Sequence, residues 1–450
     1  MEPLEGKTPG TQSPETVSTR LKRIAELARK APGMAFITLA HHIDIGFLHV
    51  AHGLTRKDGA SGVDGQTADS YEKNLEANLQ SLLDRFKSGG YQAPPVRRVY
   101  IPKGDGSKTR PIGVPTFEDK VLQRAVTMIL EAVYEQDFQN CNYGFRPGRS
   151  AHQALDALWK GTMKMHGGVV LELDIQKFFD TLTHGHLRSF LDQRIRDGVL
   201  RRMIDKWLAA GVLEDGAVHY PQSGSPQGGV VSPILSNVFL HEILDRWFED
   251  VVKPRLTGQA FLVRYADDAV IVLAHEGDAK RVMDVLPKRF AKYGLTLHPE
   301  KTRLVSFRPP KDRGRSGRPG TFDFLGFTHF WGTSRKGNWV VKRKTARSRL
   351  TRALKTLRVW LRRSLHLPVA DQHEALARKV QGHYAYYGIT GNGRALTNFL
   401  YEVGRLWRTW LGRRSDRAGM PWTEFNLFVR RYPLPRVRIV HSAMPRVANP

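Results

Sequence analysis

The sequence predicts an α+β fold in which an antiparallel sheet packs against helices. Two apolar runs, 260–264 and 269–273, flank the segment YADD at 265–268, a pattern typical of two strands joined by a tight turn. A third apolar run at 169–175 predicts another buried strand. Amphipathic segments lie between and after these runs, so the chain mixes strands with helices along its length.

The remaining elements follow from the spacing of apolar residues and from the positions of glycine and proline. Helices are predicted at 17–29, 70–87, 118–136, 150–164, 184–194, 198–210, 233–250, 278–293 and 345–366. Strands are predicted at 96–102, 169–175 and 303–308, besides the hairpin at 260–274. The last helix has leucines spaced three and four residues apart, which gives it one apolar face and one basic face.

Composition points to a polyanionic partner. The 450-residue chain carries 70 lysines and arginines against 43 aspartates and glutamates, a net charge of +27. Such an excess opposes compaction through self-repulsion and is expected where the partner is nucleic acid. The charge is concentrated, because residues 335–440 hold 24 lysines and arginines against five acids, a net +19. One part of the chain is therefore suited to hold phosphates, and the rest to catalyse a reaction.

Other protein classes are disfavoured. The single cysteine, Cys141, excludes an intrachain disulfide and a multi-cysteine zinc site. No apolar stretch reaches the roughly 20 residues that a membrane-spanning helix needs. The N-terminus lacks the basic and apolar regions of a signal peptide. We therefore expect a soluble, cytoplasmic protein without membrane association.

Three aspartates form the candidate site. Asp267 and Asp268 are adjacent in the predicted turn, where two ionised carboxylates repel each other unless a cation is bound. Asp174 ends the buried run 169–175, so pairing of that strand with the hairpin would bring the three acids together. Such hard oxygen ligands suit a pair of magnesium ions. Taken singly, the features have simpler interpretations, namely an Asp-Asp surface turn and a helix N-cap at Asp174.

Three segments, in order, resemble the palm motifs of reverse transcriptases. They are Asp174 with the residues that follow it to 180, the glycine-rich segment 223–233 (SGSPQGGVVSP) and the turn 264–268 (RYADD). Further similar blocks lie at 100–115, 143–150 and 322–327. More narrowly, the chain resembles the reverse transcriptase/maturases encoded by bacterial group II introns, in order from residue 55 to about residue 410.

The resemblance implies a right-hand polymerase, with fingers and a palm whose antiparallel sheet packs on helices, followed by a helical thumb/maturase domain. The implied segments are an N-terminal extension at 1–54 (partly disordered, then helical), fingers and palm at 55–307, a basic Pro/Gly linker at 308–320, the end of the palm with the thumb and maturase region at 321–412, and a basic tail at 413–450. The tail shows no H-N-H endonuclease pattern, so we expect no second-strand cleavage by this chain.

The resemblance also assigns roles to single residues. Asp174, Asp267 and Asp268 would be the catalytic carboxylates that hold two Mg²⁺ ions, with Asp268 contributing less direct ligation. Ile175 completes the implied metal-binding set. In an in-line nucleotidyl transfer, such a metal pair stabilises the attacking 3′-oxygen and the departing pyrophosphate.

Five further residues match positions that bind the incoming dNTP. Lys103 and Arg110 would grip the triphosphate, for which a point charge and a bidentate guanidinium are suited. Phe179 resembles the aromatic gate that rejects a 2′-hydroxyl, with a core aromatic as the alternative. Gln227 belongs to the loop that lines the nucleotide pocket, and Lys301 resembles a lysine that protonates pyrophosphate, with a solvated surface lysine as the alternative.

Other motifs are weaker. The segment 104–109 (GDGSKT) lacks the spacing of a phosphate loop and fits the tip of a fingers hairpin. A metal site among the N-terminal histidines is disfavoured against helix-face and RNA-contact roles; these residues are His41, His42, His49 and His52, beside Asp44. A group of C-terminal aromatics could stack on bases, although most are expected in the core: Tyr384, Tyr386, Tyr387, Trp407 and Trp410.

Three functional hypotheses follow. The first is a group II intron-type RNA-directed DNA polymerase and maturase that binds structured intron RNA, a template–primer duplex and dNTPs, and is nucleoid-associated when it acts on DNA. The second is a domesticated reverse transcriptase in DNA repair or phage defence. The third is a non-catalytic RNA chaperone, against which the three aspartates argue. The sequence carries no signal for the oligomeric state or for the identity of the RNA.

Overall fold

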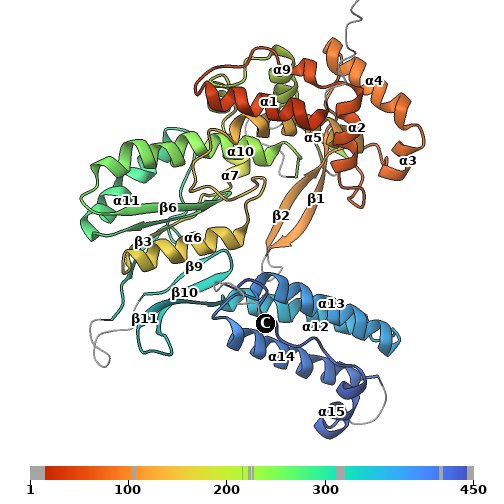
Figure 1. Ribbon diagram of the computed structural model, residues 1–450. Coiled ribbons are helices and arrows are strands. Elements are labelled where there is room, and N and C mark those ends of the chain that lie inside the picture. Colours follow the sequence, from red (N-terminus) through yellow and green to blue (C-terminus); the bar gives the residue numbers. More distant parts are fainter. Residues whose placement is uncertain are drawn as a thin grey trace, which may run out of the picture.

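The computed structural model confirms the α+β class (Figure 1). It describes residues 16–103, 108–214, 216–220, 224, 228–310, 320–414 and 419–442. Residues 1–15, most of the predicted linker and the end of the tail therefore lie outside the described residues. No helix in these ranges is long and apolar enough to cross a membrane.

A four-stranded antiparallel sheet forms the centre of the molecule. Its strand order is β6-β7-β3-β8. The strands are β3 (Gly168–Leu173), β6 (Ala260–Tyr265), β7 (Asp268–Leu273) and β8 (Arg303–Phe307). The predicted hairpin and both predicted single strands of this sheet are thus confirmed. The two strands of the hairpin face each other from Ala260–Leu273 to Tyr265–Asp268.

Both faces of this sheet are covered, which explains why its strands are apolar without alternation. One face packs on α10 (Ser232–Leu240) and α11 (Glu276–Ala291), with Leu171 and Ile271 in that core. The other face packs on α6 (Ala151–Lys164), with Val170 and Val272 in a second core. The sheet is therefore the middle layer between helices (Figure 1).

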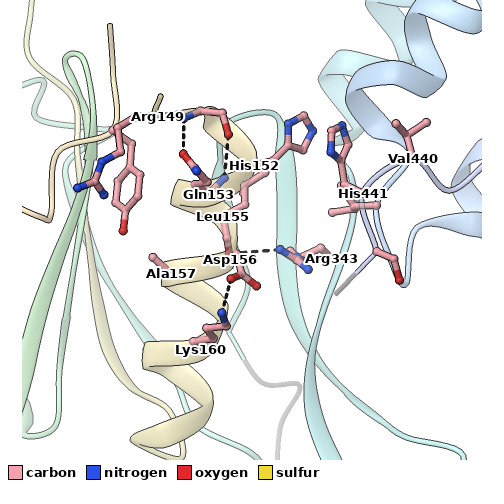
Figure 2. Close-up of a pocket in the computed structure, with 14 residues that line it drawn as sticks. Arg149, His152, Gln153, Leu155, Asp156, Ala157, Lys160, Arg343, Val440 and His441 are labelled. Carbon is pink, nitrogen blue, oxygen red and sulfur yellow. Dashed lines mark hydrogen bonds and ion pairs between the residues drawn. The ribbon is translucent and has the colours of Figure 1, made fainter. Parts of the chain in front are cut away.

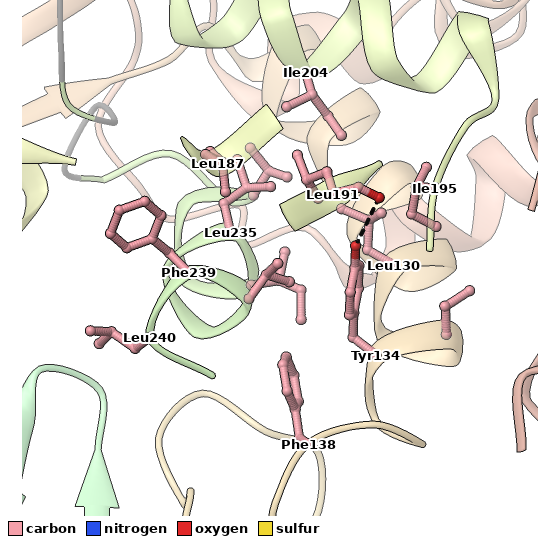
Figure 3. Packing of buried hydrophobic residues seen from close by; sticks show 14 of the residues in the cluster. Leu130, Tyr134, Phe138, Leu187, Leu191, Ile195, Ile204, Leu235, Phe239 and Leu240 are labelled. Carbon is pink, nitrogen blue, oxygen red and sulfur yellow. Dashed lines mark hydrogen bonds between the residues drawn. The ribbon is translucent and has the colours of Figure 1, made fainter. Parts of the chain in front are cut away.

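The first core extends into the helices that precede the hairpin. These are α5 (Phe117–Tyr134), α7 (Phe178–Thr181), α8 (His184–Leu191) and α9 (Gly198–Leu208). Figure 3 shows Tyr134 among apolar side chains from α8 and α10, with its hydroxyl donating to the carbonyl of Leu191 at 3.5 Å. The predicted helix 233–250 is α-helical only to Leu240 and continues as π-helical turns at His241–Asp245 and Trp247–Val252. A 3₁₀ turn, Lys253–Arg255, ends it.

The N-terminal third forms a helical layer and contributes two strands to a second sheet. The helices are α1 (Val17–Lys30), α2 (Ile45–Leu54), α3 (Ala68–Glu72) and α4 (Leu75–Ser88), with a 3₁₀ turn at Ala40–His42. The predicted helix 70–87 is wrong as one element, because it is divided between α3, which begins after a capping box at Thr67, and α4. The sheet has the order β2-β1-β4-β5, from β1 (Val96–Lys103), β2 (Lys108–Val114), β4 (Val212–Glu214) and β5 (Ala217–His219).

The C-terminal third begins with a third sheet, which was not predicted from the sequence. It contains β9 (Phe322–Phe324), β10 (Phe327–Thr333) and β11 (Trp339–Thr345). The helices that follow among the described residues are α12 (Arg347–Arg363), α13 (Val369–Tyr387), α14 (Gly393–Leu411) and α15 (Trp422–Arg431). They enclose a core of their own around the fully buried Trp407.

The chain then returns from α15 towards the central sheet. His441 pairs with Ile389 and stacks on the ring of His152 in α6, with ring centroids 3.5 Å apart. These residues border a hollow of about 730 Å³ between α6, β11 and the C-terminal segment, shown in Figure 2. Inside it, Arg343 donates to the carbonyl of Leu155 at 3.2 Å. The C-terminal segment therefore ties the helical unit to α6.

Candidate active site

Strand register brings two of the three predicted aspartates to one end of the central sheet. Strand β3 pairs with β7 so that Leu173 faces Ala269. The next residue on β3 is Asp174, and the residue before Ala269 is Asp268, so both leave the sheet at the same end. Asp267 precedes Asp268 in the turn. The predicted juxtaposition follows directly from this register.

The acids influence one another electrostatically. Burial, which is the largest cause, and the negative charges of Asp267 and Asp174 together raise the pKa of Asp268 to about 6. Burial and the charge of Asp174 also raise the pKa of Asp267, against the lowering effect of Arg110. A carboxylate resists ionisation when it is removed from water and placed beside like charges. A bound cation would offset both effects.

A lysine reaches the first of these acids. The Lys301 Nζ lies 3.1 Å from Asp174 Oδ2, which brings the predicted proton donor to the site. The loop that carries it is fixed to the end of β3, because the His298 N–H donates to the Asp174 carbonyl at 2.8 Å. Ile175 pairs with Leu297 of the same loop and has a buried side chain, so only its backbone oxygen could bind a metal.

The turn itself is backed by a buried arginine. Tyr265 pairs with Asp268, which leaves a two-residue turn in which Ala266 adopts a positive φ of 56°. Arg264 is fully buried and donates from Nη1 to the Ala266 carbonyl at 2.9 Å. Its Nε and Nη2 donate to both oxygens of the fully buried Asp245, at 2.7 and 2.5 Å. This pair holds an uncommon turn conformation in place.

Gly144 packs closely against the backbone of the same turn. A Cβ at Gly144 would clash with the backbone nitrogen of Ala266 and lie 2.9 Å from the Tyr265 carbonyl carbon. Asn237 joins the two supports, since its Nδ2 donates to the Gly144 carbonyl at 2.7 Å and its Oδ1 accepts from Arg264 at 3.1 Å. These supporting roles were not predicted from the sequence. Arg264 carried a signal, because a charge inside an apolar strand requires a buried partner.

Of the other residues predicted to bind the dNTP, the structure describes the side chains of Arg110 and Phe179 but not those of Lys103 and Gln227. Arg110 lies on β2 and is exposed, and its charge acts on Asp267. Phe179 is half-buried in α7 against Phe178, with ring centroids 5.3 Å apart, so it is partly a core residue. Lys103 is the last residue of β1, and its side chain lies outside the described part of the chain. The whole of Gln227 also lies outside it.

The described residues on either side of Gln227 lie close to α7 and β2. A Cβ at Gly224 would lie 2.7 Å from the Phe179 carbonyl oxygen, and one at Gly228 would lie 2.5 Å from the Gly113 carbonyl oxygen. Both glycines have positive φ. The backbone therefore comes close to β2 and α7 at positions that only glycine fills without strain.

A hollow of about 410 Å³ opens beside the aspartates. Asp174 and Asp268 line it on one side, and Gly326 and Arg349 on the other. The charge of Arg349, at the start of α12, lowers the pKa of Asp268. Helix α13 fixes the turn at Gly326, because the hydroxyl of Tyr386 donates to the carbonyl of Leu325 at 2.8 Å. The hollow is thus lined by acids and cations together, with Lys301 and Arg349 among the cations.

The carboxylate oxygens of the three acids are ligands that fit a divalent cation, but the three side chains are not gathered closely around one point. Among the described residues, no three histidine, cysteine, aspartate or glutamate side chains form a group that could hold a metal ion. The fit rests on the raised pKa of Asp267 and of Asp268, to which neighbouring negative charges contribute. Hard carboxylate oxygens near one another are the ligands that Mg²⁺ prefers.

The weaker motifs find structural roles. Asp44 caps α2 through the Phe47 N–H and accepts from Arg20, while His52 is buried 3.3 Å from Glu72. Among the predicted aromatics, Tyr384 and Trp407 are buried in the helical core. The others are half-buried: Tyr386, Tyr387 and Trp410.

The sequence of the site is shared with known proteins. Residues 101–329, just over half of the chain, match the reverse transcriptase (RNA-dependent DNA polymerase) family. The chain belongs to this family. The matched range contains all three aspartates, so the predicted enzyme class, RNA-directed DNA polymerase, agrees with the match.

Relatives of this reverse transcriptase include intron-encoded proteins, in agreement with the predicted resemblance. The group II intron-encoded protein LtrA of Lactococcus lactis subsp. cremoris is 36% identical over 229 residues, 50% of this chain and 37% of LtrA. Protein YkfC of Escherichia coli strain K12 is 35% identical over 240 residues, 47% of this chain and 63% of YkfC. Nuclear intron maturase 2, mitochondrial, of Arabidopsis thaliana is 28% identical over 284 residues, 52% of this chain and 37% of that protein. The chain thus spans less than two thirds of each relative.

Proposed function

We propose that this reverse transcriptase extends a primer 3′-hydroxyl with dNTPs on an RNA template. The observation that carries the proposal is the β3–β7 register, which brings Asp174 to the same end of the sheet as Asp267 and Asp268. Asp174 and Asp268 line one hollow together with Lys301 and Arg349, an arrangement that suits a reaction between a phosphate-rich substrate and a nucleophilic hydroxyl.

In this proposal the three aspartates, with the backbone oxygen of Ile175, hold two Mg²⁺ ions. When bound, these ions would neutralise charge on the phosphates and stabilise the attacking and leaving oxygens of the transfer. The protein itself supplies their ligands on rigid backbone. Asp268 begins a strand and Asp174 directly follows one, while Arg264 and Gly144 fix the turn that carries Asp267.

The neighbouring cations would act on the substrate. Arg110, with Lys103, would bind the triphosphate from the β1–β2 hairpin. Lys301 lies beside Asp174 and would give a proton to the departing pyrophosphate. Phe179 would stand beneath the sugar of the dNTP, while Gln227 and its loop would line the nucleotide pocket.

We extend the proposal to the architecture. Residues 55–307 would form fingers and palm, with the β1–β2 hairpin in the fingers and the central sheet in the palm. The third sheet and the helices α12–α15, within 321–412 and the following tail, would complete the palm and form the thumb and maturase region. Residues 1–54 would be an N-terminal extension, and 308–320 a linker.

A role on intron RNA is the second part of the proposal. We infer that the chain binds group II intron RNA to assist splicing and retrohoming, supported by the net +27 charge and by relatives named as a group II intron-encoded protein and as an intron maturase. Positive surface binds structured RNA through its phosphates. A splicing assay with a candidate intron RNA, at near-physiological magnesium, tests this part. Equal splicing rates with and without the protein would contradict it.

Primer extension tests the polymerase itself. The purified chain, an RNA template, a labelled DNA primer and dNTPs should give extension that stops when EDTA removes magnesium. Asp267→Ala should abolish extension while leaving the affinity for the template–primer nearly unchanged. Folded protein that binds the template–primer duplex but adds no nucleotide would contradict the proposal.

A further inference from the structure

Helix α14 carries an exposed stripe that the candidate active site does not use. Five residues follow one another at intervals of four and three, so they lie on one face of the helix: Arg394, Asn398, Tyr401, Arg405 and Arg408. Arg408 is half-buried, and the other four are exposed. Tyr401 is 57% exposed in the middle of this stripe. The exposed tryptophan of α15, Trp422, lies beside it. We call these six residues the α14–α15 surface.

The two aromatic rings are nearly parallel. The centroids of Tyr401 and Trp422 are 6.4 Å apart with an interplanar angle of 8°, and Trp422 is 40% exposed. Arg408 lies over the Trp422 ring, 4.4 Å from its centroid, and donates to the Met420 carbonyl at 2.7 Å. Phe425, one turn along α15, is buried in the helical core. The rings are therefore held in place rather than loosely attached.

Exposure of these rings calls for an explanation. Burying an aromatic side chain is favourable, and the same helices bury Trp407 and Phe425 completely or nearly so. Tyr401 and Trp422 instead face solvent beside three arginines of the stripe. The surrounding region, 335–440, has a net charge of +19. Among described neighbours, Glu402 is held by Arg405 at 3.0 Å, so the stripe keeps a positive excess.

We propose that the α14–α15 surface binds an unpaired nucleotide of an RNA, whose base stacks on Tyr401 or Trp422 while the arginines contact flanking phosphates. Every base has a stacking face, and aromatic side chains with arginines are the side chains that single-stranded RNA contacts in this way. A fully paired duplex hides its bases, so the proposed contact selects RNA with a loop, bulge or free end.

This inference rests on the proposed function, because it assumes that a structured RNA is the partner. It adds where an unpaired base binds and how it is recognised. The surface belongs to α14 and α15, whereas the candidate active site is built from the central sheet and the segments beside it (Figure 1). Substitutions on the surface should therefore change RNA binding without changing the aspartate site.

The test compares two RNAs of equal length, a hairpin with an unpaired loop and a blunt, fully paired duplex. Affinities of the intact protein are measured at several salt concentrations. Tyr401→Ala and Trp422→Leu should each weaken hairpin binding about tenfold and leave duplex binding unchanged. Tyr401→Phe should retain most of the affinity, because it keeps the ring. Arg405→Gln should lower the slope of log affinity against log salt by about one, which the aromatic variants should not.

A matched control comes from the same helix pair. Leu427 is 63% exposed on α15, and Leu427→Ala should bind both RNAs like the wild type. Thermal unfolding of each variant reports whether it folds, and Trp422→Leu tests the proposal if Tyr401→Ala does not fold. Equal losses of affinity for the hairpin and the duplex would overturn the proposal. Wild-type affinity for the hairpin in the folded aromatic variants would also overturn it, and would favour a protein as the partner of this surface.

Primer extension by the same samples separates the two proposals. If the wild type binds the hairpin through these rings but extends no primer, the polymerase proposal fails and the surface stands. If it extends primers and the aromatic variants bind the hairpin as tightly as the wild type, the surface fails and the polymerase stands.

Discussion

Arg264 and Asp245 form a fully buried ion pair directly behind the turn that carries Asp267. Both side chains are 0% exposed, and the arginine donates through Nε and Nη2 to the two carboxylate oxygens. Removing two charges from water is costly, so such a pair is weak evidence for stability by itself. The remaining donor, Nη1, reaches Asn237 and the Ala266 carbonyl. The pair therefore links the core to the conformation of the turn.

Breaking this pair should destabilise the protein and disable the site. Arg264→Met leaves Asp245 buried without the guanidinium that neutralises it, which should lower the free energy of unfolding by ~3–5 kcal/mol. Arg264→Lys keeps the charge but loses the two-bond geometry, so it should fold and still extend primers slowly. Chemical denaturation and primer extension measure the two effects. Arg188→Met, which breaks an exposed pair with Asp205, is the control and should cost less than about 1 kcal/mol.

Gly144→Ala should affect catalysis more than folding. The new Cβ would displace the Ala266 backbone, and a shift of about 1 Å at a catalytic group can slow a reaction by about a hundredfold. We expect a fall in kcat with a smaller change in KM for dNTP. Gly382→Ala, in α13 with open space around its Cβ position, should leave extension unchanged. Wild-type kcat for Gly144→Ala would show that the turn tolerates displacement.

Lys301→Met should slow nucleotide addition itself. If Lys301 protonates the leaving pyrophosphate, its loss should reduce single-turnover incorporation by about a hundredfold, with primer–template affinity unchanged. Rapid-quench measurement of one dNTP addition reports this step. Lys280→Met removes an exposed lysine paired with Glu276 and serves as the control. Equal rates for Lys301→Met and wild type would exclude the proton-donor role.

Acid should destabilise the third sheet through a buried histidine. His329 is fully buried in β10 and stacked on Phe322, and burial with the charge of Arg343 lowers its pKa to about 3. The unfolded chain binds a proton near pH 6.5 and the folded chain does not, so stability is complete above pH 6.5 and falls towards pH 3. The loss from this group should be about 2 kcal/mol at pH 5 relative to pH 8.

A variant isolates that contribution. His329→Phe should flatten the pH dependence of the free energy of unfolding between pH 8 and pH 5, because the substituted ring does not titrate. His366→Gln, at an exposed histidine of the linker between α12 and α13, should leave it unchanged. An unchanged slope for His329→Phe would contradict the role of burial. Denaturant titrations at matched ionic strength provide the measurement.

The sequence predicted the central sheet well because its signal is local. Both faces are buried, so its strands are continuous apolar runs, and the carboxylates stand where those runs stop. The third sheet carried no such signal. The strand β10 buries His329, and β11 buries Arg343 and Thr345, so polar residues occupy core positions and break the apolar pattern. The break between α3 and α4 lacks proline or glycine, which hid it as well.

The candidate site divides in the same way. The three aspartates and Lys301 could be predicted because they stand in segments with a recognisable local pattern. The support behind them could not. Asp245 lies 19 residues before Arg264 on a different element, and Gly144 meets the turn only after folding. Such pairings depend on tertiary structure, which a single sequence does not specify locally.

The most direct test asks whether the three acids act as one site. Asp174→Asn, Asp267→Asn and Asp268→Asn are compared with Asp284→Asn, an exposed acid on α11, in magnesium-dependent extension of a DNA primer on an RNA template. We predict that the first two abolish extension, that Asp268→Asn reduces it severely, and that Asp284→Asn extends like the wild type. Folded Asp174→Asn or Asp267→Asn protein that still polymerised at the wild-type rate would contradict the account.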